Sequence, residues 1–156
     1  MNTAYLLVGS NIEPLHNAQQ AMILLRSMVQ IERISRTWVI PSIGSPGPDF
    51  INFAVEITTD LGQAELKEKV ISEIEQALKR VRSSDKNAPR TIDIDIILFN
   101  GELLDSEIWH RPYVALPIAD LAPDLHYPGG QIPLREIAQE MQLTTPAHLF
   151  NQSELI

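Results

Sequence analysis

Cysteine is absent from the chain, which excludes disulfide bonds, thiolate nucleophiles and thiolate metal sites. A chain without cysteine is typical of a reducing compartment, so we expect a cytoplasmic protein. No apolar run approaches the roughly 20 residues that a membrane-spanning helix needs, and residues 1–9 lack the basic leader of a signal peptide. We therefore expect no membrane partner.

Basic residues are also scarce. The chain has 12 lysines and arginines against 20 aspartates and glutamates, which gives a formal net charge of −8 at pH 7. General binding of nucleic acid requires a basic face, so we expect no nucleic-acid partner. The length of 156 residues, with 44% hydrophobic and 21% charged residues, is that of an ordinary globular protein. We expect one domain over residues 1–156.

The most informative stretch is residues 88–99, which favours a buried strand because Ile, Thr and Phe dominate it. Side chains alternate across a strand. One face is therefore expected to be apolar and to carry Ile92, Ile94, Ile96 and Leu98. The opposite face is expected to carry Thr91, Asp93, Asp95 and Ile97. This arrangement places two acids on one face, roughly 6–7 Å apart at the backbone.

The acid pair Asp93 and Asp95 allows two interpretations. One is the ordinary solvent face of a strand. The other is a site for a polyphosphate carried on metal ions, because a carboxylate pair in an apolar strand is costly unless a cation satisfies it. Two Mg²⁺ ions, typically about 3.5–4 Å apart, fit between two such side chains. A basic run leads into the strand and favours the second interpretation; its members are Arg80, Arg82, Lys86 and Arg90.

The periodicity of the rest of the chain predicts an α+β protein. Strand patterns occur at residues 4–8, 31–40, 50–58 and 88–99. Helical spacing of apolar residues occurs at residues 14–29 and 63–81. The resulting order is that of a ferredoxin-like, split βαβ sandwich, an antiparallel sheet with two main helices on one face. C-terminal additions are expected at residues 102–105 (an edge strand), 114–121 and 134–141 (short apolar turns or helices).

Further residues have the character of ligand contacts. Residues 41–48 contain three prolines and two glycines, which predicts a loop of restricted shape rather than a strand or helix. Phe50 and Asn52 follow it on one strand face, where Phe can stack on a planar heterocycle and Asn can hydrogen-bond its edge. Residues 109–113, Trp-His-Arg-Pro-Tyr, are suited to an anionic or aromatic ligand. Each feature alone also has a purely structural interpretation.

Taken together, these residues resemble the 6-hydroxymethyl-7,8-dihydropterin pyrophosphokinase family of folate biosynthesis. The most specific piece is residues 89–96, Pro-Arg-Thr-Ile-Asp-Ile-Asp-Ile, which is close to the family signature of Pro-Arg-Thr, an aliphatic residue, then Asp-x-Asp. The resemblance runs over residues 4–123. Its other pieces are Gly9-Ser10-Asn11, Phe50-Ile51-Asn52 and Arg80-Val81-Arg82.

The resemblance implies an enzyme that transfers a pyrophosphoryl group from ATP to a hydroxymethyl pterin and releases AMP. It implies that Asp93 and Asp95 bind two Mg²⁺ ions bridging the triphosphate, and that Arg80 and Arg90 balance charge growing at the β-phosphorus. The nucleotide contacts implied are Glu75, Arg82, Arg90, Ile96, His110 and Arg111. The pterin contacts implied are Gly9, Pro41, Ser42, Ile43, Phe50, Asn52 and Tyr113. ATP and the pterin are the expected small-molecule partners, and association with neighbouring folate enzymes is left open.

The chain departs from the family pattern at three places. Asn87-Ala88 stand where the family commonly has an aromatic residue and glycine before Pro-Arg, Val39-Ile40 stand where it has Arg-Thr, and a Pro-His segment ahead of the aromatic turn is shortened. Two other functions also remain open. A non-catalytic ferredoxin-like module that binds a small molecule would not need the basic run. A different two-metal nucleotide transferase would keep Asp93 and Asp95 but not the 41–48 loop with Phe50 and Asn52.

Overall fold

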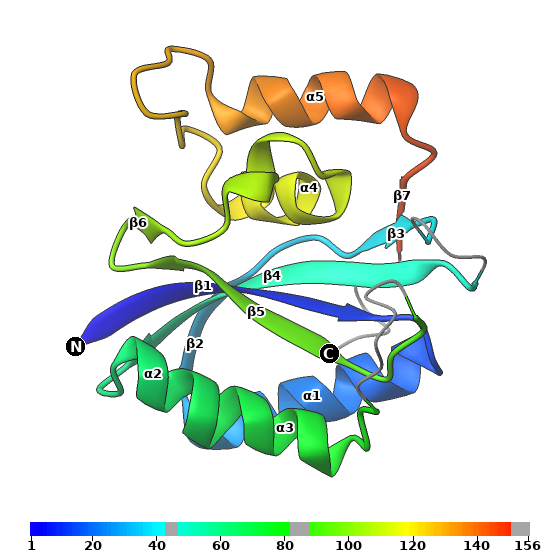
Figure 1. Cartoon of the computed structure of the whole chain (residues 1–156), viewed down its shortest axis with the longest axis vertical. Coiled ribbons are helices and arrows are strands. Elements are labelled where there is room, and N and C mark those ends of the chain that lie inside the picture. The colour runs from blue at the N-terminus through cyan, green and yellow to red at the C-terminus, as the bar shows by residue number, and fades with distance from the viewer. Residues whose placement is uncertain (43–46, 82–87, 151–156) are drawn as a thin grey trace.

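The computed structural model describes residues 1–42, 47–81 and 88–150. In this part of the chain, seven strands form one antiparallel sheet with the order β6-β5-β1-β4-β3-β7, while β2 pairs with the remaining length of β4 (Figure 1). The predicted ferredoxin-like order and the α+β class are confirmed. The strands are β1 (Asn2–Ser10), β2 (Gln30–Ile34), β3 (Trp38–Ile40), β4 (Phe50–Thr59), β5 (Asp93–Phe99), β6 (Glu102–Leu103) and β7 (His148–Leu149).

The two main helices cover one face of the sheet, as expected (Figure 1). The first is α1 (Pro14–Met28), and the second is a continuous helical stretch made of α2 (Gln63–Leu66), the π-helical turn η1 (Lys67–Ile71) and α3 (Ser72–Ala77). Proline at the start of α1 costs no hydrogen bond, because the first helical N–H groups have no partner within the helix. The predicted apolar face of β5 contributes Ile92 and Ile94 to this core.

The C-terminal additions cover the opposite face. They are the 3₁₀ turn η2 (Ser106–Trp109), α4 (Pro112–Leu121) and α5 (Leu134–Thr144). Seven of the ten residues of α4 are buried, because this helix lies between the sheet and α5 (Figure 1). A helix that is apolar on all sides needs such a position. The acid-bearing face of β5 therefore lies on the same side of the sheet as α4.

The alternation predicted for residues 91–98 holds through Ile97 and is wrong at Leu98. The pairing of β1 with β5 shifts register between Tyr5 and Leu6, which is a β-bulge. Ile97 and Leu98 consequently both pack on the α4 side of the sheet, whereas Leu98 had been expected on the opposite side with Ile94. The bulge does not reach Asp93 and Asp95, so their predicted common face is preserved.

Three element boundaries also differ from the prediction. The strand expected at residues 31–40 is broken into β2 and β3, because the hydroxyl of Ser35 accepts the N–H of Ala54 at 2.7 Å in place of a backbone carbonyl. The helix expected to reach residue 81 ends at Ala77, and Lys79 has a positive φ of 60°. The C-terminal stretch, for which no element was predicted from the sequence, adds β7 to the edge of β3.

None of the helices in the described ranges is long and apolar enough to cross a membrane.

Candidate active site

A pocket of about 620 Å³ lies at one end of the sheet. Antiparallel pairing brings the ends of β1 and β3 beside the starts of β4 and β5, and all four contribute lining residues. The strand β6 pairs only with Leu98 and Phe99, so no described strand covers the start of β5 on that side. The pocket therefore extends around this edge of the sheet to η1 and α3, while Arg111 and Tyr113 line it from the start of α4.

The strand register arranges the proposed ligand contacts in rows. Asp93, Gly9 and Asn52 are partners across β5, β1 and β4 and form one row. The next row on the same face contains Asp95, Leu7 and Ala54. Since side chains two residues apart share a face, Asp93 and Asp95 both point toward the pocket.

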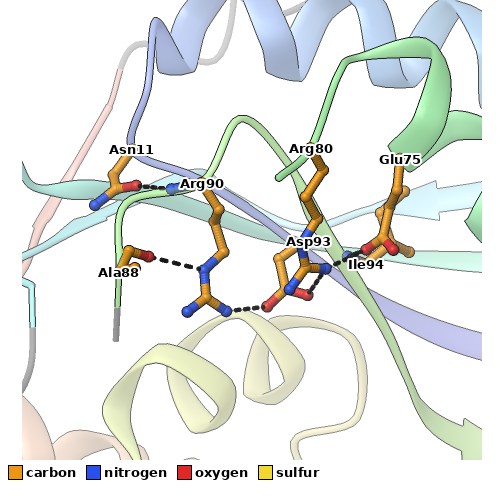
Figure 2. Close-up of polar contacts among 7 residues, drawn as sticks. All are labelled: Asn11, Glu75, Arg80, Ala88, Arg90, Asp93 and Ile94. Atoms are coloured by element: carbon orange, nitrogen blue, oxygen red, sulfur yellow. Dashed lines mark hydrogen bonds and ion pairs between the residues drawn. The ribbon is translucent and has the colours of Figure 1, made fainter. Parts of the chain in front are cut away.

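Two arginines hold Asp93 from opposite sides (Figure 2). Arg80 Nη1 donates to Asp93 Oδ1 at 2.8 Å, and Arg90 Nη1 donates to Asp93 Oδ2 at 3.1 Å. The two arginine side chains are only 11% and 18% exposed, so water screens these ion pairs less than it would at the surface. Two members of the basic run, Arg80 and Arg90, thus meet one member of the acid pair, Asp93, in space.

Glu75 anchors Arg80 from α3. Arg80 Nη1 donates to Glu75 Oε2 at 2.5 Å, and the backbone N–H of Ile94 donates to the same oxygen at 3.2 Å (Figure 2). The side chain of Glu75 is 6% exposed, and a buried carboxylate needs such partners. Glu75 therefore fixes the end of α3 to the start of β5 and positions the guanidinium of Arg80 beside Asp93.

Asp95 is the acid whose ionisation the pocket disfavours. Loss of water around the side chain, followed by the negative charges of Asp93, Glu75 and Asp105, raises the pKa of Asp95 to about 6, although Arg80 acts in the opposite direction. A cation beside Asp95 would favour the ionised carboxylate. Carboxylate oxygens are also the ligands that Mg²⁺ prefers.

This pKa predicts a pH-dependent effect of Asp95→Asn on the metal-free protein. Between the ordinary pKa of 3.8 and about 6, the folded state binds more protons than the unfolded state, so the free energy of unfolding falls as the pH rises. Because Asp95 is an exposed residue, solvent screens much of this effect, so we expect Asp95→Asn to raise Tm at pH 8 by only about 2 °C, and to leave it unchanged at pH 3.5. Thermal unfolding in the presence of a chelator measures both values. An equal gain at both pH values would show that charge is not the cause.

The residues expected to contact a planar ring line the same pocket. They are Gly9, Pro41, Phe50, Asn52 and Tyr113. Asn52 is 3% exposed, and its Nδ2 has no hydrogen-bond partner within the described residues. A buried N–H group without a partner costs free energy, so this amide is suited to a ligand that accepts its hydrogen bond.

Gly9 provides the space that Asn52 occupies. A Cβ at position 9 would lie 2.8 Å from Asn52 Oδ1, closer than such atoms pack. We expect Gly9→Ala to displace the amide and to raise KM for the ring substrate about tenfold, the effect of one lost hydrogen bond. Steady-state kinetics measure this change. Gly62→Ala is the matched control, because its nearest contact would be 3.9 Å away and outside the pocket. A normal KM in Gly9→Ala would contradict this role of Asn52.

The other residues named from the sequence have different positions. Arg111 lines the pocket and pairs with Glu107 at 3.2 Å. Three residues, Ser42, Ile96 and His110, do not belong to the described lining: Ile96 packs into the core under α1 and α3, and His110 is exposed. Ile43 and Arg82 lie outside the described residues.

Sequence reasoning missed several lining residues, among them Lys67, Ile71, Ser72 and Asp105. The first three lie on or directly after the π-helical turn, where the Ser72 N–H donates to the Lys67 carbonyl. Periodicity over residues 63–81 indicated only an ordinary helix, and π turns frequently occur at functional sites. Asp105 stood in an expected edge strand, but it instead accepts the Glu107 N–H as the cap of η2. No signal in the sequence marked these residues.

Paired acids and arginines that share one pocket of a covered antiparallel sheet are suited to phosphate groups and their counter-ions. Comparison with known proteins is more specific. The 7,8-dihydro-6-hydroxymethylpterin-pyrophosphokinase (HPPK) family matches residues 5–123, and this chain belongs to that family.

Relatives extend over most of the chain. A 2-amino-4-hydroxy-6-hydroxymethyldihydropteridine pyrophosphokinase of Synechocystis sp. is 30% identical over 148 residues, which cover 88% of this chain and 75% of the relative. The enzyme of that name in Bacillus subtilis is 34% identical over 132 residues, 77% of this chain and 78% of its own length.

Among solved structures, wild-type HPPK-DHPS of Plasmodium falciparum has a TM-score of 0.69 and 13% identity, and covers 90% of this chain. This chain spans 41% of that longer protein. At this level of identity the likeness concerns the fold alone. It agrees with the sheet order and the helical layers described above.

Proposed function

We propose that this pocket is where pyrophosphate passes from ATP to 6-hydroxymethyl-7,8-dihydropterin, giving AMP and the pterin diphosphate, a step of folate biosynthesis. The chain is an ATP-dependent pyrophosphokinase by family, and ATP is its co-substrate. The observation that carries the assignment of the site is the meeting of two residue sets in one pocket. One set has acids and arginines, and the other has Phe50, Asn52 and Tyr113.

The ring side of the pocket is suited to a pterin. In our proposal, Phe50 and Tyr113 enclose the flat ring, and the unpartnered Nδ2 of Asn52 donates to an acceptor on its edge. The guanidinium of Arg90 lies 5.9 Å from the centre of the Phe50 ring. A pterin stacked on Phe50 would therefore be next to the arginine that also contacts Asp93. This proximity supports placing the hydroxymethyl group beside the phosphate-binding residues.

The charge of the pocket supports a metal–nucleotide complex. Four cationic side chains (Lys67, Arg80, Arg90 and Arg111) and four carboxylates (Glu75, Asp93, Asp95 and Asp105) line it, so the formal charge of the described lining is 4 − 4 = 0. An ATP molecule brings about four negative charges, and metal ions normally neutralise them in phosphoryl transfer. Two Mg²⁺ ions would balance that charge.

The donor set also fits magnesium. Asp93 and Asp95 provide hard oxygen ligands, and no group of three or more His, Cys, Asp or Glu among the described residues could hold a metal by itself. The two acids therefore suit ions that complete their coordination with phosphate oxygens and water. When bound, such ions would bridge the phosphates and reduce the charge that opposes nucleophilic attack.

Arg80 and Arg90 act on the phosphate in this proposal. Both guanidinium groups neutralise Asp93 when no nucleotide is present. Asp93 would hold a metal ion that offsets its charge, and the forks of both arginines would then be available to phosphate oxygens around the β-phosphorus. Glu75 keeps Arg80 at the pocket wall. These residues supply positioning and charge balance, which is most of what phosphoryl transfer requires.

Product analysis tests the proposed function. The purified protein is incubated with ATP, Mg²⁺ and 6-hydroxymethyl-7,8-dihydropterin, and the nucleotides are separated by chromatography. AMP in equal amount to pterin diphosphate is expected. Formation of ADP would indicate transfer of a single phosphoryl group, and the absence of any pterin product would contradict the proposal. The Asp95→Ala variant is the control for contaminating ATPases.

A further inference from the structure

Asn11 is a buried residue at the end of β1 that has no role in the reaction described so far. It is 1% exposed, and its Oδ1 accepts the backbone N–H of Arg90 at 2.8 Å (Figure 2). Its own backbone N–H donates to the Arg90 carbonyl at 3.1 Å. Its Nδ2 donates to the Pro48 carbonyl at 3.3 Å. One side chain thus connects two segments that lie 79 and 37 residues away in sequence.

The segment that carries Arg90 depends on these bonds. Arg90 precedes the first residue of β5, and its neighbour Pro89 has no N–H to donate. Both backbone polar groups of Arg90 are instead bonded to Asn11. From this fixed backbone, the side chain reaches Asp93 at 3.1 Å and the Ala88 carbonyl at 3.3 Å. The two bonds to Asn11 therefore fix the backbone position from which the Arg90 side chain extends.

The other segment that Asn11 contacts, at Pro48, leads into β4, the strand that is proposed to bind the ring. Pro48 lies two residues before Phe50, the first residue of β4. A Cβ added at Gly47 would lie 3.8 Å from Pro89 Cγ and 3.9 Å from Asn11 Nδ2. The described end of the 41–48 loop and the segment before β5 are thus in contact around Asn11.

We propose that Asn11 is a positioning residue that holds Arg90 at a fixed place relative to the strand that binds the pterin ring. The inference rests on the proposed function and adds to it a residue outside the described lining of the pocket. Pyrophosphoryl transfer requires the acceptor oxygen, the phosphorus and the balancing cation to be aligned together. The bonds of Asn11 link the backbone of Arg90, whose guanidinium is the balancing cation, to the segment that precedes Phe50.

A purely structural role for Asn11 makes a different prediction. A buried asparagine that bonds loop backbone stabilises a fold, and its loss lowers Tm in either case. Only a positioning role makes the effect on catalysis depend on the Arg90 side chain. Once that side chain is removed, the placement of its backbone no longer influences the reaction.

A double-mutant cycle with Asn11→Ala and Arg90→Ala distinguishes the two roles. Single-turnover rates of AMP formation are measured at saturating substrates and expressed per folded molecule. We expect Asn11→Ala to slow the reaction by about 10–100-fold in the wild-type background, the range for a small misplacement. In the Arg90→Ala background we expect less than about a threefold further loss. Asn11→Ser is measured in parallel, so that the cycle can be read even if the alanine variant does not fold.

Asn2→Ala is the matched control. Asn2 lies at the other end of β1, and its Nδ2 donates to the Leu61 carbonyl at 2.8 Å, far from the pocket. We expect it to lower Tm without changing the rate per folded molecule. An equal loss from Asn11→Ala in both backgrounds, or an unchanged rate, would overturn the positioning role while wild-type activity upholds the proposed function. Wild-type protein that forms no AMP would overturn both.

Discussion

Replacing either Asp93 or Asp95 with alanine is expected to abolish turnover, by at least about 10³-fold, while the protein remains folded. Both carboxylates point into one pocket from one strand face, and in our proposal they provide the protein ligands for the magnesium ions. Removing one of them takes away a ligand that would hold the magnesium ions, and with them the triphosphate, on the protein. The measurement is the rate of AMP formation at saturating Mg²⁺.

The two variants should differ in stability, which separates the metal role from the ion-pair role. Asp93 accepts from both Arg80 and Arg90, so Asp93→Ala leaves two cations without this partner and should lower Tm. Asp95→Ala removes a carboxylate whose ionised form the pocket disfavours, so it should keep or raise Tm above pH 6.

Magnesium titration provides the second measurement for this pair. Calorimetry with a non-hydrolysable ATP analogue should show weaker magnesium-dependent nucleotide binding in both variants. Asp60→Ala, an exposed acid at the end of β4, is the control and should behave as the wild type. Near-normal turnover in both single variants would mean that the acids do not bind the metal.

The acid face of β5 could be predicted because period-two alternation does not depend on tertiary structure. Ile92 and Ile94 pack on the helices, and Asp93 and Asp95 point away from them, as the pattern required. The alternation failed at Leu98, which follows a bulge that inserts Ile97 into β5. Bulges arise from the pairing of two strands, and a single strand's sequence does not mark them.

The residues that form the walls of the pocket were harder to predict from the sequence. Asp93 and the residues that hold it come from α3, the segment after it and β5, and only the folded chain shows that Arg80 bonds both Glu75 and Asp93. The sequence predicted one continuous helix over residues 63–81. In the structure the helix ends at Ala77, and this turns Arg80 back toward Glu75. Helix ends are set by local backbone geometry, which periodicity does not fix.

Arg90 is expected to act mainly by stabilising the transition state. We predict that Arg90→Ala keeps most of its ATP affinity and loses about 10²–10⁵ in kcat, the range for a charge-stabilising donor. A residue that acts only in the transition state lowers kcat and kcat/KM together. Arg90→Lys should recover part of the loss, because an ammonium supplies the charge but not the fork. Stopped-flow or quenched-flow AMP formation and equilibrium binding of an ATP analogue measure the two quantities.

Arg80→Ala is the matched comparison, since both arginines contact Asp93 and, within the described ranges, Arg80 also pairs with the buried Glu75. Arg80→Ala takes this ion pair away from a carboxylate that is 6% exposed, so it should lower both Tm and activity. The described ion pair of Arg90 is with Asp93, whose side chain is 25% exposed, so Arg90→Ala should lose activity with a smaller loss of Tm. If Arg90→Ala were instead unstable, with wild-type turnover per folded molecule, Arg90 would belong to the scaffold and its proposed catalytic role would be wrong.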